Sequence, residues 1–441
     1  CVTFMFLLLQ KKMKLLSRIF LISYLLPLYA YTEVDLNKLY IDLHKNPELS
    51  FQEKRTSEML AGILEEMSFE VTSGVGGYGV IAVLKNGPGN TLMIRADMDA
   101  LPLEEKTGAK YASKKKSINQ VGAEVFTMHA CGHDIHMTSL IGTAQNLIKL
   151  KDQWTGTLIL NLQPAEERGS GARAMIKDGL FERFPRPDFN LALHVSADLP
   201  AGKIAYVPGW AMANVDSMDI IVKGIGGHGA YPHKTIDPIV LSSQLINNIQ
   251  TIRSREISPL DAAVVTVGSI HGGTKHNIIP DEVTLQLTLR SYTDEVRNKT
   301  ISSIKRISRG IAQSAGLPEE LYPEITLKDE YTPALYNNPE FTDRIRSIAE
   351  KAIGKENVIK STPVMGGEDF GMYGRVEPRI PSVLFWLGAV NKNVYDRSKR
   401  ESIDLPSLHS PFFLPDYKPT INTGVQATTA MALNILTPST E

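Results

Sequence analysis

Short apolar runs, each long enough for one strand, alternate with helical segments over much of this sequence. Runs bounded by Gly, Asn or Pro occur at 80–84, 92–94, 158–160 and 191–193. Between them apolar residues recur at helical spacing, most clearly along one face of 135–150. Strands that alternate with helices indicate a layered α/β domain with a mostly parallel sheet.

The order of elements changes after Pro208-Gly209. From 217 to about 331 the patterns predict strand, helix, strand, strand, helix and strand, the order of a ferredoxin-like unit. The pattern of the α/β domain then resumes, with a helix at 341–353 and a final helix at 420–436. The sequence therefore predicts a ferredoxin-like α+β domain, residues 214–331, inserted into an α/β domain formed by residues 31–213 and 332–441.

The first thirty residues differ in composition from the rest. An apolar run at 19–28 and a small residue, Ala30, follow four basic residues with no acidic one among them: Lys11, Lys12, Lys14 and Arg18. The run is about half of the ~20 residues that a spanning helix needs. We therefore expect residues 1–30 to be a signal peptide cleaved near Ala30, with a periplasmic or secreted product and no stable membrane insertion; an uncleaved anchor is the alternative.

Charge and cysteine content narrow the function further. Lys and Arg total 47 against 48 Asp and Glu, so no excess of positive charge favours a nucleic-acid partner. The cysteines are Cys1 and Cys131, and cleavage of the signal peptide would remove the first. Cys131 would then be a single thiol in an oxidising compartment, unable to form an intramolecular disulfide.

Polar side chains cluster where the predicted strands end. Loops that leave the carboxyl edge of a parallel sheet converge, and α/β proteins bind ligands there. The metal-type residues at these positions are Asp97, Asp99, Cys131, His133, Glu166, Glu167 and His194, and His409 lies in a loop near the C-terminus. This arrangement predicts a metal site.

Each of these motifs also has a simpler interpretation. A Cys-x-His spacing such as Cys131-Gly-His133 is often coincidental, although metal binding would occupy the lone thiolate. Adjacent glutamates are usually solvated, but Glu166-Glu167 follows an apolar strand at a strand-to-helix corner. Neighbouring residues there point to opposite sides, so one can bind a metal while the other acts as a base.

Six motifs in order carry a family resemblance. The sequence over roughly 35–437 is similar to the amidohydrolase branch of the aminoacylase and glutamate carboxypeptidase family, which includes hippurate hydrolases and plant auxin-conjugate hydrolases. The motifs are Arg-Ala-Asp-Met-Asp-Ala-Leu-Pro at 95–102, Met-His-Ala-Cys-Gly-His-Asp at 128–134, Gln-Pro-Ala-Glu-Glu at 163–167, Gly-Gly-His-Gly-Ala-Tyr-Pro-His at 226–233, Asn-Ile-Ile-Pro at 277–280 and Gly-Gly-Glu-Asp-Phe at 366–370.

The resemblance implies a site with two divalent metal ions in the α/β domain. It assigns Glu166 as general base and Asp99 as the aspartate that orients or tunes the metal centre. The implied ligands are Cys131, bridging the ions, with His133, Glu167, His194 and His409. Asp97 stands where the wider family has a histidine ligand, so His133 must replace that ligand. Zinc or manganese is expected, and cobalt or nickel also suits mixed ligands.

The inserted domain is implied to be a lid that forms a homodimer. His228 matches the family histidine that reaches the active site of the partner subunit and stabilises the oxyanion. Asn277 and Arg290 match lid positions that bind the carboxylate end of the substrate. Gly366 and Gly367 would offer backbone amides to the substrate.

The expected function is hydrolysis of the amide bond of N-acyl amino acids, either hippurate-like or N-acetyl conjugates. A metallocarboxypeptidase acting on a small peptide or folate-like substrate is the nearest alternative. From other classes, a periplasmic solute-binding protein shares the export signal and two-lobed size, and a cysteine hydrolase would use Cys131 with a histidine.

Overall fold

The computed structural model describes residues 33–329 and 331–437, of which those from Asp35 onward form one compact unit. The predicted signal peptide, residues 1–30, lies outside the described residues. Among the helices that the structure describes, none is both long and apolar enough to cross a membrane.

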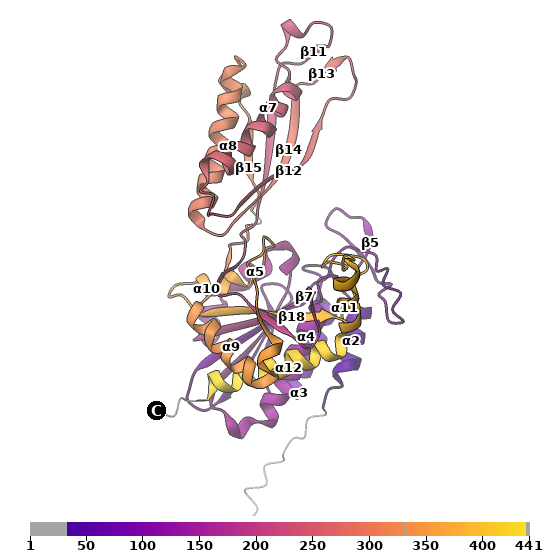
Figure 1. Cartoon of the computed structure of the whole chain (residues 1–441), viewed down its shortest axis with the longest axis vertical. Coiled ribbons are helices and arrows are strands. Elements are labelled where there is room, and N and C mark those ends of the chain that lie inside the picture. The colour runs from indigo at the N-terminus through magenta and orange to yellow at the C-terminus, as the bar shows by residue number, and fades with distance from the viewer. Residues whose placement is uncertain (1–32, 330, 438–441) are drawn as a thin grey trace, which may run out of the picture. The chain divides into compact units, whose positions relative to one another are not determined.

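An eight-stranded sheet forms the centre of the α/β domain (Figure 1). Its four middle strands, which include the predicted runs at 92–94, 158–160 and 191–193, pair in parallel. Antiparallel pairs lie on both sides of them. The order is β1 (Glu70–Val75), β2 (Gly79–Asn86), β6 (Gly156–Gln163), β3 (Thr91–Asp97), β7 (Phe189–Pro200), β18 (Ser382–Val390), β8 (Ile204–Tyr206) and β17 (Val358–Lys360).

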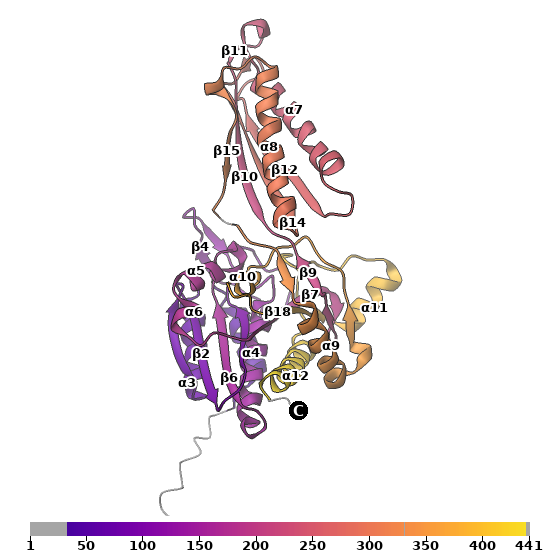
Figure 2. The same cartoon turned by 90° about the vertical axis from the view of Figure 1, so that its left-hand side faces the viewer.

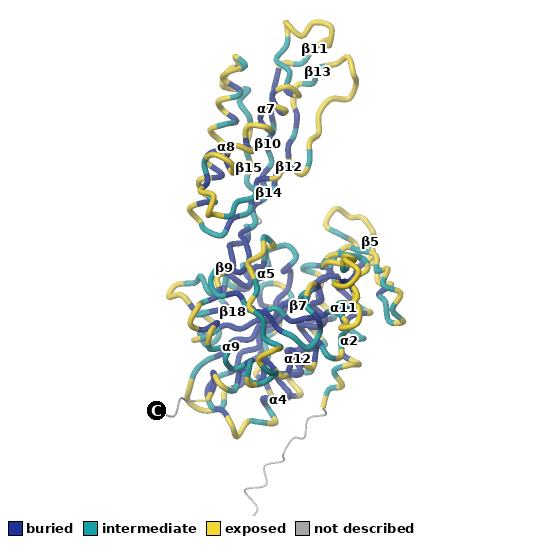
Figure 3. The backbone as a smooth tube through the Cα atoms, viewed as in Figure 1, coloured by how far each residue is buried: buried dark blue, intermediate teal, exposed yellow. Residues whose placement is uncertain are grey.

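Helices cover both faces of this sheet. On one face an apolar cluster joins strand residues such as Met93 and Ile159 to Met175 and Tyr373. The helices on that face are α5 (Gly171–Lys177), α6 (Leu180–Arg183) and α10 (Gly371–Arg375). The others of this domain are α2 (Leu36–Lys45), α3 (Lys54–Glu66), α4 (His133–Lys149), α9 (Pro339–Ile353), α11 (Lys392–Glu401) and α12 (Tyr417–Leu436). Figure 3 shows the central strands as buried backbone.

The inserted segment forms a sheet of its own. Its four strands lie in the order β12, β14, β10, β15, all antiparallel, as in a ferredoxin-like unit. Two helices cover one face and share a separate apolar core with the strands (Figure 2). The elements are β10 (Asp216–Lys223), α7 (Pro238–Thr251), β12 (Ala263–Gly272), β14 (Glu282–Ser291), α8 (Asp294–Ser314) and β15 (Glu324–Leu327).

Short strand pairs complete the described chain. They are β4 (Lys116–Ile118) with β5 (Glu124–Phe126), β9 (Gly209–Met212) with β16 (Leu335–Asn337), and β11 (Gly227–His228) with β13 (Ile278–Ile279). The predicted fold class, an α/β fold with a mixed and mostly parallel central sheet, is confirmed.

Candidate metal centre and substrate pocket

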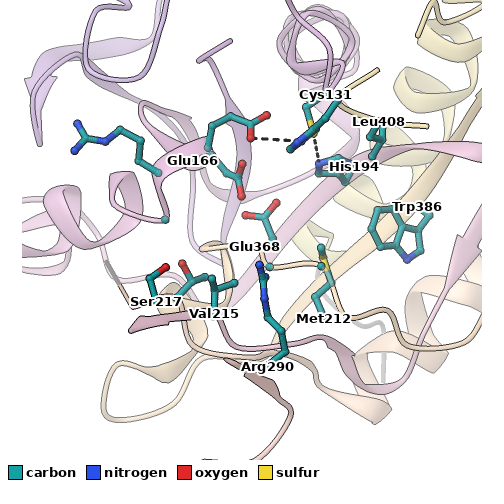
Figure 4. Close-up of a pocket in the computed structure, with 17 residues that line it drawn as sticks. Cys131, Glu166, His194, Met212, Val215, Ser217, Arg290, Glu368, Trp386 and Leu408 are labelled. Carbon is teal, nitrogen blue, oxygen red and sulfur yellow. Dashed lines mark hydrogen bonds and ion pairs between the residues drawn. The ribbon is translucent and has the colours of Figure 1, made fainter. Parts of the chain in front are cut away.

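A pocket of about 530 Å³ lies where the sequence places its metal-type residues. Side chains from strand ends, the start of α4 and the inserted sheet border it (Figure 4). Its lining includes Cys131, Glu166, Glu167, His194, Arg290, Gly366, Gly367 and His409.

The five predicted ligand side chains converge although their elements are far apart in sequence. Cys131 Sγ lies 3.6 Å from His194 Nε2 and 3.3 Å from His409 Nε2. Glu167 Oε2 lies 3.4 Å from His409 Nε2, and Glu167 Oε1 lies 3.9 Å from His133 Nε2. Two triads of ligand-type atoms result, Cys131 with His133 and His194, and Cys131 with Glu167 and His409.

Two of the histidines are oriented for metal binding. The Nδ1 of His133 pairs with the Asp99 carbonyl oxygen (2.7 Å), and the Nδ1 of His194 pairs with that of Val195 (2.8 Å). A carbonyl only accepts, so each Nδ1 carries a proton, and each Nε2 faces the cluster as the nitrogen that could bind a metal ion. His133 Nε2 and Glu167 Oε1 are buried without a hydrogen-bond partner. Such orphaned ligand atoms fit a divalent ion.

The charges of the cluster fit a cation as well. Burial raises the pKa of Glu166 and of Cys131, and it raises the pKa of Glu167 to about 8. Burial lowers the pKa of His133, but the negative side chains around it, Asp97 first, outweigh burial and raise the pKa to about 10. Without a cation, burial therefore favours the neutral forms of Glu166, Glu167 and Cys131, and a bound divalent ion would favour their ionised forms.

The Glu166-Glu167 corner depends on an unusual backbone conformation. Ala165 joins β6 to the short 3-10 turn Glu166–Arg168 and has a left-handed φ of 51°. Asp99 Oδ1 accepts from the Glu166 amide (3.1 Å), and its Oδ2 accepts from the Glu167 amide (3.0 Å). Asp99 therefore holds the backbone that carries the two glutamates.

Asp97, at the position of the histidine ligand in the wider family, has other partners. Its Oδ1 bonds His136 Nδ1 (2.5 Å), and its Oδ2 accepts from Arg95 (2.7 Å). His136 Nε2 in turn accepts from the Val195 amide (2.9 Å), next to His194. Asp97 and His136 thus support the strand that presents His194, and Asp97 Oδ2 also lies 3.5 Å from His133 Nε2 at the edge of the ligand cluster.

A buried charge cluster surrounds Arg95, whose role the sequence analysis missed. Its guanidinium donates to Asp97, Glu368 (2.8 Å) and Asp369 (3.2 Å), all buried. These bonds tie the end of β3 to the loop that contains Gly366 and Gly367. The sequence contained one sign of this role, because the charged Arg95 lies within an otherwise apolar stretch of β3.

The inserted sheet contributes Arg290 to the pocket. Arg290 Nε donates to Thr288 Oγ1 (3.1 Å), and Figure 4 shows the guanidinium end directed toward Glu368. A Cβ at Gly367 would lie 3.5 Å from Arg290 Nη1 and 2.2 Å from Val215 Cγ2. Glycine at 367 therefore leaves the space that these two side chains occupy. At Gly366 the carbonyl accepts from the Ala213 amide (2.9 Å).

His228 and Asn277 are not brought to the pocket. Both lie near β11 and β13, where the Gly229 amide donates to the Asn277 carbonyl (2.9 Å). Ser217 lines the pocket at the start of β10, whereas β11 follows the other end of that strand. Six residues of strand separate these ends by about 20 Å. Within one chain, His228 and Arg290 therefore lie at opposite ends of the inserted sheet.

An apolar wall borders the ligand cluster, and the sequence analysis did not identify it. Trp386 on β18 pairs in register with His194 on β7, and the two rings meet edge to face with centroids 5.4 Å apart. Leu408 precedes His409, and Met212 lies beside Gly366. In Figure 4, Trp386, Leu408 and Met212 lie on one side of the pocket and Arg290 rises from below.

Several known proteins are similar to this chain in sequence and in fold. The family described as Peptidase family M20/M25/M40 matches residues 93–410. Thermostable carboxypeptidase 2 of Saccharolobus solfataricus is 39% identical over 79% of this chain and 84% of its own. Hippurate hydrolase of Campylobacter jejuni is 38% identical over 79% and 87%. A solved dinuclear metal-binding peptidase of Bacillus subtilis has a TM-score of 0.71 and 30% identity, covering 91% of this chain and 97% of its own.

Proposed function

The chain belongs to peptidase family M20/M25/M40, and from this premise we propose that it hydrolyses the amide bond of N-acyl amino acids with two divalent metal ions. Membership makes it a metal-dependent amidohydrolase, as the motif resemblance predicted. The two triads that share Cys131 carry the dinuclear part of the proposal.

One ion would be held by Cys131, His133 and His194, and the other by Cys131, Glu167 and His409. The thiolate would bridge them, which accounts for a lone cysteine at the centre of the site. A soft sulfur ligand favours zinc, and the nitrogen and oxygen ligands also admit manganese, cobalt or nickel.

Glu166 would act as the general base and acid. Bound divalent ions supply the Lewis acidity that lowers the pKa of water toward ~7. The Glu166 carboxylate takes a proton from the attacking water and donates it to the leaving amine nitrogen. Burial of this carboxyl raises its pKa, which suits a group that must both accept and return a proton near neutral pH.

The pocket would bind both the carboxylate and the acyl group of an N-acyl amino acid. Arg290 would bind the substrate carboxylate, for which its fixed charge and planar donors are suited. The wall of Trp386, Leu408 and Met212 would take an apolar acyl group beside the ligand cluster. Residues 214–331 would then act as a lid, because they supply Arg290 to a site that residues 31–213 and 332–441 otherwise form.

A homodimer would complete the site. A strand about 20 Å long separates the end of the sheet that carries Arg290 from the end next to His228, so His228 would stabilise an oxyanion only in a partner's pocket. The lid has surface for such an association, since β12 is an edge strand and Ile239, Val240 and Ile270 are exposed. Mixing His228→Ala with Glu166→Gln protein should restore part of the activity through heterodimers, and no rescue at any ratio would contradict this role.

A carboxypeptidase is the second candidate function. The same ligand cluster and Arg290 would accept a peptide with a free C-terminal carboxylate, and one relative is named a carboxypeptidase. A solute-binding protein would have no use for a buried Glu166 beside ligand-type atoms. A cysteine hydrolase would need a readily ionised thiol, whereas burial raises the pKa of Cys131.

Export remains a proposal based on the composition of residues 1–30. N-terminal sequencing of protein recovered from the periplasm or medium should place the mature start near Ala30. Recovery of uncleaved protein from the cytoplasm would contradict it.

Metal analysis combined with a substrate panel tests the proposed function. Purified protein should contain two divalent ions per chain and should hydrolyse N-benzoyl or N-acetyl amino acids faster than dipeptides of matched side chains. Faster dipeptide hydrolysis would favour the carboxypeptidase, and inactivation by alkylation but not by chelation would favour the cysteine hydrolase.

A further inference from the structure

A second buried carboxyl group supports the catalytic corner from outside the strand ends. Glu53 precedes α3, and its side chain turns into the protein instead of capping that helix. The residue is 0% exposed. Its Oε1 accepts from the Phe51 amide (3.0 Å) and from the Ala165 amide (2.8 Å), 112 residues away in sequence.

The bond to Ala165 matters because of the conformation of that residue. A non-glycine residue in the left-handed region is strained and persists only where its surroundings hold it. Glu53 holds the amide of Ala165, and Asp99 holds the amides of Glu166 and Glu167. Two buried carboxyl groups thus fix three successive amides of the corner.

The segment around Glu53 also secures Asp99. Ser50 Oγ donates to Asp99 Oδ2 (2.6 Å), so the bend before α3 contacts both groups that hold the corner. Phe51 adds a contact between its ring and the Arg168 guanidinium, 5.5 Å apart, at the far end of the turn. Residues 50–53 therefore contact, and help to fix, the backbone that carries Glu166 and Glu167.

We propose that Glu53 is a positioning residue for the metal centre, which fixes the ligand Glu167 and the base Glu166 through the Ala165 amide. The residue touches neither substrate nor ligand atoms. This inference rests on the proposed function only in the roles that it gives to Glu166 and Glu167.

Two substitutions of Glu53 distinguish its role as hydrogen-bond acceptor for the Ala165 amide from a role in filling space. Glu53→Gln retains an acceptor oxygen at similar volume, whereas Glu53→Ala removes it. Burial, followed by the charge of Asp99, raises the pKa of Glu53 to about 8, so the neutral amide also matches its charge at pH 7. If the alanine variant fails to fold, Glu53→Asp replaces it. The aspartate side chain is one methylene shorter, so its carboxylate lies farther from the Ala165 amide, and this variant is compared with Glu53→Gln instead.

Glu48→Ala is the matched control. Glu48 accepts from the amides of Arg55 (3.2 Å) and Thr56 (2.8 Å), so its loss loosens the same helix start without touching the corner. A purely structural role for Glu53 would make the two alanine variants behave alike.

Zinc affinity, measured by competition with a chelator, and the separate kcat and KM values are the readouts. Glu53→Ala should weaken zinc binding by about 10–100-fold and lower kcat by about 100-fold with little change in KM. Glu53→Gln and Glu48→Ala should stay close to the wild type in both. Wild-type zinc affinity and kcat in Glu53→Ala, or equal damage in Glu53→Gln and Glu53→Ala, would overturn the proposal.

The zinc measurement keeps this inference separate from the proposed function. If the wild type hydrolyses no N-acyl amino acid, the proposed function fails, but the order of zinc affinities still decides the role of Glu53. If hydrolysis is as proposed while all variants bind zinc equally, only the positioning role fails.

Discussion

Replacing Arg95 with methionine would test the buried charge cluster beneath the pocket. The guanidinium donates to Asp97, Glu368 and Asp369, and methionine leaves these buried carboxylates without their cation. Breaking a buried ion pair costs about 3–5 kcal/mol because an uncompensated charge remains. With an unfolding entropy of about 2 cal/mol/K per residue, a chain of this length should lose about 3–6 °C in Tm.

Differential scanning calorimetry of metal-loaded protein measures this loss, and two further variants sharpen it. Adding Glu368→Gln to Arg95→Met should recover part of the stability, because one of the unpaired carboxylates becomes neutral. Arg309→Met is the control, since Arg309 and Glu319 form an exposed pair worth at most about 1 kcal/mol. An Arg95→Met variant no less stable than Arg309→Met would refute the reasoning.

Three further predictions follow from the same geometry. Burial lowers the pKa of His44, but its bonds to Asp134 and Glu105 raise it to about 9, so stability present below pH 6.5 should be lost as pH rises through 9. His44→Gln should flatten that loss in urea unfolding series, and an unchanged slope would contradict it. Trp386→Ala should lower kcat/KM for N-benzoyl substrates by about tenfold more than for N-acetyl ones; equal losses would refute the apolar wall. Cys131→Ser should bind fewer than two ions per chain by elemental analysis, and unchanged stoichiometry would exclude the thiolate bridge.

The sequence predicted the inner strands better than the outer ones. Buried strands such as β3 need apolar residues on both faces, which produces the runs that were recognised. The outer strand β1 is largely exposed and carries Glu70, Thr72 and Ser73, so no apolar run marks it. The short strand β17 is only partly buried and was missed for the same reason.

The side chains of the candidate site could be predicted from the sequence, but the residues that hold them in position could not. Residues at strand ends converge for topological reasons, so Cys131, Glu167 and His194 could be grouped from position alone. Glu53 acts through a backbone amide 112 residues away, and no local pattern reveals such a contact. The sequence also does not reveal which end of the inserted sheet borders the pocket, so Asn277 was grouped with Arg290 although the two lie at opposite ends of that sheet.

Replacing Glu166 with glutamine tests whether this carboxylate is the base of a metal-dependent hydrolysis. The amide preserves size and leaves the proposed ligands in place, but it cannot take the proton of the attacking water. These ligands are Cys131, His133, Glu167, His194 and His409. Elemental analysis and turnover of an N-acyl amino acid should be measured on the same preparation. We expect wild-type metal content with hydrolysis lowered at least about 100-fold. A variant that hydrolyses its substrate as fast as the wild type would exclude Glu166 as the base.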